Sequence, residues 1–158
     1  MNDRDFTLTR EVAAPRDAVW ASWTDPAELS WFFSGMQDPA ERVTVDLRVG
    51  GAWRLLMVVS ETTRYVTGGV YREIVPGNRL VFSWGAVGGW PDIDPNHLDA
   101  VPLTTVELGT IPNGTAMTLT ASFPGEISDA AAQEWLNSGM REGWGMTLDR
   151  LVEKYATN

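Results

Sequence analysis

Within residues 104–123, TTVELGTIPNGTAMTLTASF, apolar and polar side chains alternate from Thr105 onward, on both sides of the pair Asn113–Gly114. A period of two residues is typical of a strand with one buried face, and Asn-Gly between two such runs is a strong signal for a hairpin turn. Because the polar face needs no cover, the pattern predicts an antiparallel sheet that is covered on one side only.

Five earlier segments repeat this pattern. Turns are predicted at Gly50–Gly51 and Pro76–Gly77, where glycine adopts positive φ at little cost. The five predicted strands are residues 6–12, 43–47, 52–60 and 64–74, and a strand that contains Leu80, Phe82 and Trp84. With the hairpin, the sequence predicts seven strands.

Helical spacing occurs in two places. APRDAVWASWTDPAELSWFF, residues 14–33, predicts two short helices, the second over Pro26–Phe32. After the possible N-cap Ser128, one helix of roughly 27 residues is predicted to run to Tyr155, about 40 Å long. Its apolar face is predicted to contain Leu136, Met140, Trp144, Thr147, Leu151 and Tyr155.

Two glycines flank Trp144 within this helix, and each costs about 1 kcal/mol relative to alanine. We expect Gly143 to let the helix pass close to the sheet and Trp144 to project inward. Gly145 is expected on the outer side.

Composition limits the function classes. The chain has 158 residues, which predicts one domain over residues 1–158. A net charge of −9 argues against nonspecific binding to nucleic acid or anionic lipid and leaves a basic protein as a partner. The absence of cysteine excludes disulfides and thiolate metal sites. No apolar run is long enough to span a bilayer, so no membrane insertion and a cytoplasmic location are expected.

Five ordered motifs are similar to a known family: REVAAPRDAVWASWTDPAELSWF, DLRVGGAWRLLM, GGVYREIVPGNRLVFSW, GTAMTLT and GWGMTLDRL. From about Leu8 to Leu151 the chain resembles the homologues of the activator of the ninety-kilodalton heat-shock chaperone ATPase, in the START-like (SRPBCC, birch-pollen-allergen-like) superfamily. The resemblance implies an α+β helix-grip fold, in which a curved seven-stranded antiparallel sheet wraps around a long C-terminal helix. Residues 85–105 look like a longer loop than is usual in the family.

Aromatic and methionine side chains gather on the predicted inward positions. They are suited to an apolar ligand because they offer large contact area and adaptable shape. The alternative is that they simply fill the core. The candidate ligand-binding residues are Trp31, Phe32, Trp53, Met57, Trp84, Met117, Met140 and Trp144. No cofactor, metal site or catalytic residue is predicted.

Three functions remain open from the sequence. The first is binding of a small hydrophobic molecule between the sheet and the C-terminal helix. The second is a protein-interaction module that acts on a chaperone or a basic client protein. The third is a cyclase- or hydrolase-like enzyme that uses Arg72, Glu73 or His97 as an acid or base, although Arg72 and Glu73 are more typical of strand-surface charges.

An acidic segment of the predicted loop offers oxygen and nitrogen ligands at close spacing. It lacks the glycine and the distal glutamate of a calcium loop, so a solvated acidic turn is the favoured interpretation. Its ligand-type residues are Asp92, Asp94, Asn96, His97 and Asp99.

Overall fold

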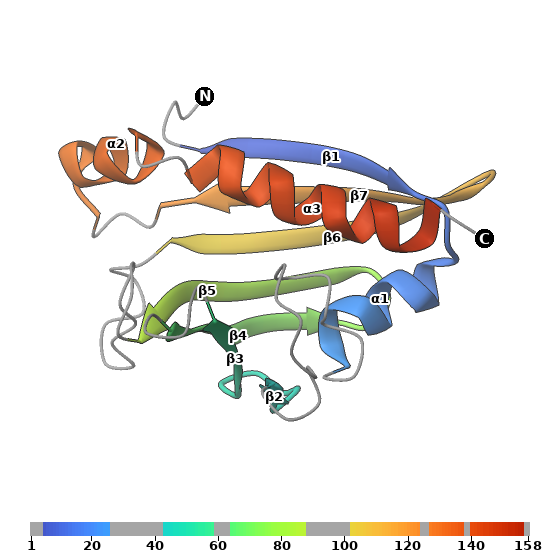
Figure 1. Cartoon of the computed structure of the whole chain (residues 1–158), viewed down its shortest axis with the longest axis horizontal. Helices are drawn as coiled ribbons and strands as arrows, with labels where there is room; N and C mark the ends of the chain where they lie inside the picture. The colour runs from blue at the N-terminus through green and yellow to red at the C-terminus, as the bar shows by residue number, and fades with distance from the viewer. Residues whose placement is uncertain are drawn as a thin grey trace.

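A computed structural model describes residues 5–25, 43–58, 64–87, 102–123, 127–137 and 140–156 (Figure 1). These residues form a seven-stranded antiparallel sheet with the strand order β1-β7-β6-β5-β4-β3-β2. The strands are β1 (Phe6–Val12), β2 (Val43–Val45), β3 (Ala52–Val58), β4 (Arg64–Val75), β5 (Arg79–Val87), β6 (Leu103–Ile111) and β7 (Gly114–Ser122). The first strand along the chain therefore lies beside the last.

The predicted turns are found between the expected strands. Gly50 and Gly77 have φ of 86° and 76°, values that residues other than glycine rarely adopt. Asn113 lies in the turn that joins β6 to β7. Both ends of the predicted loop over residues 85–105 lie in strands instead, because β5 continues to Val87 and β6 begins at Leu103, whereas residues 88–101 lie outside the described ranges.

A bulge in β4 departs from simple alternation. Tyr71 pairs with Phe82 of β5, whereas the next paired residue, Glu73, lies opposite Val81. The extra residue, Arg72, shifts the phase, so that Tyr71 and Ile74 both lie on the sheet face that carries Phe82. We call this the inner face.

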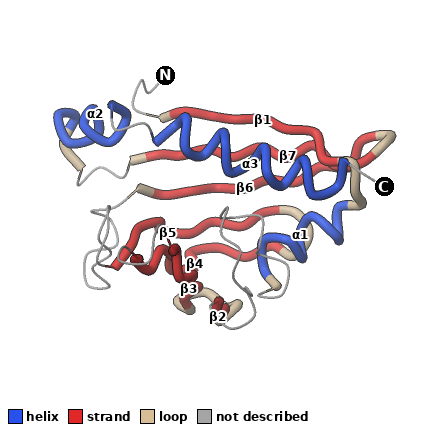
Figure 2. Tube along the Cα trace, viewed as in Figure 1, coloured by secondary structure: helices blue, strands red, loops and turns tan. Residues whose placement is uncertain are grey.

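In the part of the chain that the structure describes, three helices accompany the sheet, and α1 and α3 cover its inner face (Figure 2). They are α1 (Arg16–Thr24), α2 (Asp129–Asn137) and α3 (Met140–Ala156). The second short helix predicted over Pro26–Phe32 lies outside the described ranges. The single C-terminal helix predicted from the sequence is wrong, because α2 ends at Asn137 and α3 begins at Met140. The predicted start is confirmed, since the hydroxyl of Ser128 accepts a hydrogen bond from the Ala131 N–H at 3.1 Å.

Polar contacts fix α1 against α3. The Ser22 and Tyr155 hydroxyls are 2.8 Å apart, and Tyr155 also reaches the Ala18 carbonyl at 3.3 Å. Lys154 Nζ lies 3.4 Å from Ser22 Oγ. Ser22 is fully buried, so the hydrogen bonds satisfy a hydroxyl that would otherwise oppose packing. Within the described ranges no helix is long and apolar enough to cross a membrane.

Within α3, the buried face departs from the predicted one at Thr147, and the predicted Leu136 belongs to α2 instead. Trp144 is buried as predicted, but its buried neighbours are Leu148 and Leu151. Thr147 is only half-buried, and its hydroxyl donates to the Gly143 carbonyl at 2.9 Å. Each residue advances about 100° around a helix. A buried face that contains Leu148 and not Thr147 is therefore centred closer to Gly145 than the predicted face.

The predicted roles of the two glycines are therefore wrong. Gly143 is exposed, and a Cβ there would meet nothing within 4 Å. A Cβ at Gly145 would lie 3.4 Å from Nη2 of Arg10 in β1. Arg10 in turn forms an ion pair with Asp149 of α3, with Nε 2.8 Å from Oδ1, so Gly145 is the glycine on the side of the sheet.

Candidate functional site

Four aromatic rings from different elements meet over the inner face, and we call them the aromatic cluster: Trp23 of α1, Trp53 of β3, Phe82 of β5 and Trp144 of α3. The Trp23 ring centroid lies 6.4 Å from that of Phe82 and 6.5 Å from that of Trp144. Trp53 meets Phe82 edge-on at 5.3 Å. Each side chain is at most 5% exposed, so the cluster is continuous and buried.

Small and sulfur-containing residues fit closely around these rings. The indole N–H of Trp23 donates to Sδ of Met117 at 3.4 Å. Gly69 of β4 pairs with Trp53, and a Cβ there would clash with the backbone carbonyl oxygen of Ser83 and would lie 2.8 Å from Nε1 of Trp53 and 3.0 Å from Cδ1 of Phe82. Glycine at position 69 therefore lets Trp53 and Phe82 approach the sheet and each other.

Two buried hydroxyls flank Phe82 in the same cross-strand row. Tyr71 of β4 and Thr104 of β6 both pair with Phe82, and they are 1% and 0% exposed. Neither Oη of Tyr71 nor Oγ1 of Thr104 has a hydrogen-bond partner among the residues that the structure describes. Buried polar atoms are normally satisfied, so a row with two such hydroxyls is unusual.

The Tyr71 hydroxyl remains protonated under ordinary conditions. Burial raises its pKa well above the usual value, and the negative charge of Asp46 adds to the rise. Tyr71 is thus a neutral O–H donor next to the aromatic cluster. Thr104 can both donate and accept.

The structure brings together three of the eight predicted ligand-binding residues, namely Trp53, Met117 and Trp144. Met57 and Trp84 lie in β3 and β5, and Met140 begins α3. The register pairs Trp84 with Gly69, which places position 84 in the same row as Trp53. Trp31 and Phe32 lie outside the described residues.

Four residues of this region were not predicted as site residues: Trp23, Tyr71, Phe82 and Thr104. The spacing of Trp23 in its helix and the inward position of Phe82 were signals that the sequence did contain. Tyr71 and Thr104 had no comparable signal, because one adjoins a bulge and the other falls in the predicted loop.

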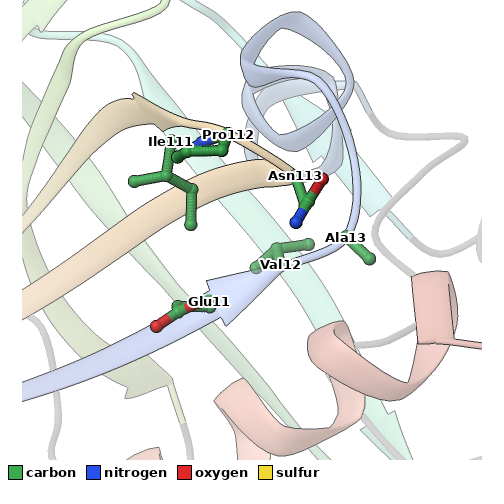
Figure 3. A pocket seen from close by; sticks show the side chains of 6 residues that line it. All are labelled: Glu11, Val12, Ala13, Ile111, Pro112 and Asn113. Carbon is green, nitrogen blue, oxygen red and sulfur yellow. The ribbon is translucent and has the colours of Figure 1, made fainter.

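A pocket of about 320 Å³ lies elsewhere, where β1 ends beside the turn between β6 and β7 (Figure 3). It is lined by Glu11, Val12, Ala13, Ile111, Pro112 and Asn113. Ala13, Pro112 and Asn113 are exposed, and Glu11 supplies the carboxylate. Trp53, Met117 and Trp144, the predicted ligand-binding residues whose side chains the structure describes, do not line this pocket.

The residues weighed as acids or bases are not placed in the aromatic cluster. Arg72 and Glu73 are exposed, as expected of strand-surface charges. Arg72 Nη1 lies 3.2 Å from the Ser83 hydroxyl, and Glu73 pairs with Arg79 at 3.2 Å. His97 and the acidic segment at residues 92–99 lie outside the described residues, and within the described ranges no three metal-ligand side chains gather.

An antiparallel sheet with a few helices on one face fits the helix-grip fold of the START-like superfamily. The model of the family described as Activator of Hsp90 ATPase homolog 1-like protein matches residues 13–155, and the chain belongs to this family. The family resemblance inferred from the motifs is confirmed.

Solved structures agree with this assignment. A protein from Nitrosomonas europaea is 27% identical with a TM-score of 0.75, over 97% of this chain and 95% of that one. An uncharacterized protein from Rhizobium leguminosarum is 25% identical with a TM-score of 0.69, over 93% and 90%. An AHSA1-like protein from Aeromonas hydrophila is 18% identical with a TM-score of 0.65, over 94% and 90%, and shows the fold alone. A search of curated proteins gives no match.

Proposed function

We propose that this chain binds a small hydrophobic molecule, aromatic or lipid-like, in a cavity between the inner face of the sheet and α3. The observation that carries the proposal is the aromatic cluster bordered by the hydroxyls of Tyr71 and Thr104. Ligand sites of this kind combine apolar and aromatic walls with a few polar groups that orient the ligand.

A core filled by its own side chains accounts for the burial of the rings but not for the two hydroxyls. A buried hydroxyl without a partner costs about 1–3 kcal/mol, so Phe and Val would serve a purely structural core better than Tyr71 and Thr104. Bound ligand would restore the missing contacts. The family resemblance supports the same conclusion, because the START-like superfamily includes lipid carriers and hormone receptors.

The test uses the purified full chain and a panel of small aromatic and aliphatic probes. Native mass spectrometry measures stoichiometry, and thermal unfolding measures stabilisation. A ligand that binds only the folded state stabilises it by about 2.7 kcal/mol at one hundred times Kd. We expect one probe molecule per chain and a concentration-dependent rise in Tm.

Two variants of α3 locate the bound probe. Trp144 is 4% exposed in the aromatic cluster, whereas Met146 on the same helix is 63% exposed. We expect Trp144→Phe to weaken binding several-fold and Met146→Ala to leave it unchanged. Equal effects of the two substitutions would indicate surface adsorption. If no probe binds and a crystal structure shows the space filled by side chains, the proposal is lost.

An interaction module is the second candidate. The turn between β2 and β3 exposes 43% of Leu47 and 62% of Val49, two apolar side chains separated in the sequence only by Arg48. In this case the chain should bind the ninety-kilodalton chaperone or a basic client. The double variant Leu47→Asp, Val49→Asp should abolish the association, measured by analytical ultracentrifugation with Met146→Ala as the control. Sedimentation of the chain and chaperone as separate species would remove this candidate.

A further inference from the structure

We infer that the ligand is an uncharged apolar molecule that carries a hydroxyl or carbonyl oxygen, and that this oxygen forms a hydrogen bond with the hydroxyl of Tyr71 or of Thr104. The inference rests on the proposed function and adds the chemical class of the ligand and the residues that select it.

The two hydroxyls border one position of the inner face. Tyr71 and Thr104 flank Phe82 from the two neighbouring strands. Adjacent strands are about 4.8 Å apart, so the two backbones lie roughly 10 Å from each other with the Phe82 position between them. A small aromatic molecule set against the cluster would be bordered by an O–H on each side.

The two hydroxyls differ in the hydrogen bonds that they can form. Tyr71 is a donor that stays protonated, because burial and Asp46 raise its pKa, and Thr104 both donates and accepts. A carbonyl oxygen can accept from either hydroxyl, and a ligand hydroxyl can also donate to Thr104. A hydrocarbon would leave both groups unsatisfied.

The charged groups near the site also limit the charge of the ligand. Asp46 lies close enough to Tyr71 to act on its ionisation, but this exposed carboxylate is paired with Arg48 at 2.9 Å, so it opposes an anion bound at Tyr71 only weakly. Arg10, a guanidinium on the inner face at the β1 edge, is already paired with Asp149 at 2.8 Å. Burying a carboxylate without a cation is strongly unfavourable, and the site therefore favours the neutral oxygen.

The experiment compares naphthalene, 2-naphthol and 2-naphthoate at pH 7 on the full chain, with dissociation constants from fluorescence titration. A neutral hydrogen bond is worth enough for 2-naphthol to bind roughly three- to tenfold more tightly than naphthalene. 2-Naphthoate should bind most weakly. In Tyr71→Phe and Thr104→Val the advantage of 2-naphthol over naphthalene should shrink or vanish, while naphthalene binds at least as well.

A matched control lies on the same strand. Thr105 is adjacent to Thr104 and points to the opposite face, so Thr105→Val should keep the wild-type order of the three probes. Thermal unfolding without ligand gives a second readout. Removing an unsatisfied hydroxyl should leave Tm unchanged or raise it by about 2–4 °C, whereas a structural hydroxyl would lower Tm when removed.

Each outcome decides between the two proposals. If none of the probes binds, the proposed function fails and this inference fails with it. If naphthalene and 2-naphthol bind wild type equally well, hydrophobic binding stands and only the inference is overturned. Tightest binding of 2-naphthoate would overturn the choice of a neutral ligand, and an advantage of 2-naphthol that survives both substitutions would overturn the assignment to Tyr71 and Thr104.

Discussion

Two neighbouring rows cross the inner face of the same five strands, two residues apart on four of them and three apart on β4, where the bulge lies. The aliphatic row consists of Leu8, Leu119, Val106, Leu80 and Ile74. The mixed row consists of Phe6, Ala121, Thr104, Phe82 and Tyr71. Both rows are buried at their centre, with Val106 1% and Thr104 0% exposed, but only the mixed row contains hydroxyls.

The difference distinguishes residues that only pack the core from residues that would select a ligand. The aliphatic row obeys the rule that interiors hold apolar side chains, and nothing beyond folding is needed to explain it. The mixed row breaks this rule at Tyr71 and Thr104, whose hydroxyls are buried and have no hydrogen-bond partner among the described residues. Departures from local rules are expected at functional sites, so the mixed row is where a ligand should act.

The largest expected effect on stability comes from truncating a buried side chain of the aliphatic row. Leu119 is fully buried, and Leu119→Ala should lower the free energy of unfolding by about 2–5 kcal/mol, because it removes apolar contacts and leaves a cavity. Urea unfolding measures the loss. Thr118→Ala, on the other face of β7, should stay within about 0.5 kcal/mol of wild type. A loss below about 1 kcal/mol for Leu119→Ala would mean that this row is not the core.

A reciprocal exchange of valine and threonine on β6 compares the two rows directly. Val106→Thr places a hydroxyl in the aliphatic row and should cost about 1–3 kcal/mol, since the residues paired with position 106, Leu80 and Leu119, are apolar. Thr104→Val makes the opposite change two residues away and should be neutral or stabilising. Urea unfolding of both variants gives the two signs, and equal destabilisation would show that the rows are equivalent.

Much of the sheet was predictable because alternation and turn chemistry are local. The positive φ at Gly50 and Gly77 and the hairpin at Asn113 require only a few adjacent residues. The antiparallel sheet and its α-helical cover on one face follow from the same pattern. The family resemblance added the helix-grip fold.

The mixed row could not be predicted, for two physical reasons. A bulge is a property of strand pairing, so the phase shift between Tyr71 and Glu73 does not appear in the sequence of β4. Thr104 is polar and follows a stretch rich in glycine and proline, which indicates a loop until pairing with Phe82 places it in β6. Trp53, Met117 and Trp144 were predictable because large apolar residues at inward positions are a strong local signal.

Alkaline pH tests the environment of Tyr71 directly. Its pKa in the folded chain lies above the unfolded value of 10.0, so the folded state holds a proton that the unfolded state loses as pH rises past 10.0. Stability should therefore fall in that range, with a contribution of up to about 1.4 kcal/mol per pH unit from this one group. Urea unfolding at several pH values should give a shallower fall for Tyr71→Phe than for wild type. Thr104→Val has no titrating group at position 104 and should keep the wild-type slope; an unchanged slope for Tyr71→Phe would show that Tyr71 is not shielded from water.

The smallest effect tests α3, the cover of the inner face. Gly143→Leu adds a side chain that begins in open space and should stabilise the helix by about 0.5–1 kcal/mol. Gly145→Leu makes the same gain but displaces Arg10 from its ion pair with Asp149, a half-exposed pair worth about 0.2–1 kcal/mol, so it should be the less stable of the two. Thermal unfolding ranks the variants, and the reverse order would restore the face assignment expected from the sequence. Both should keep the wild-type preference for 2-naphthol, because neither position belongs to the mixed row; a changed preference would show that selection is not confined to that row.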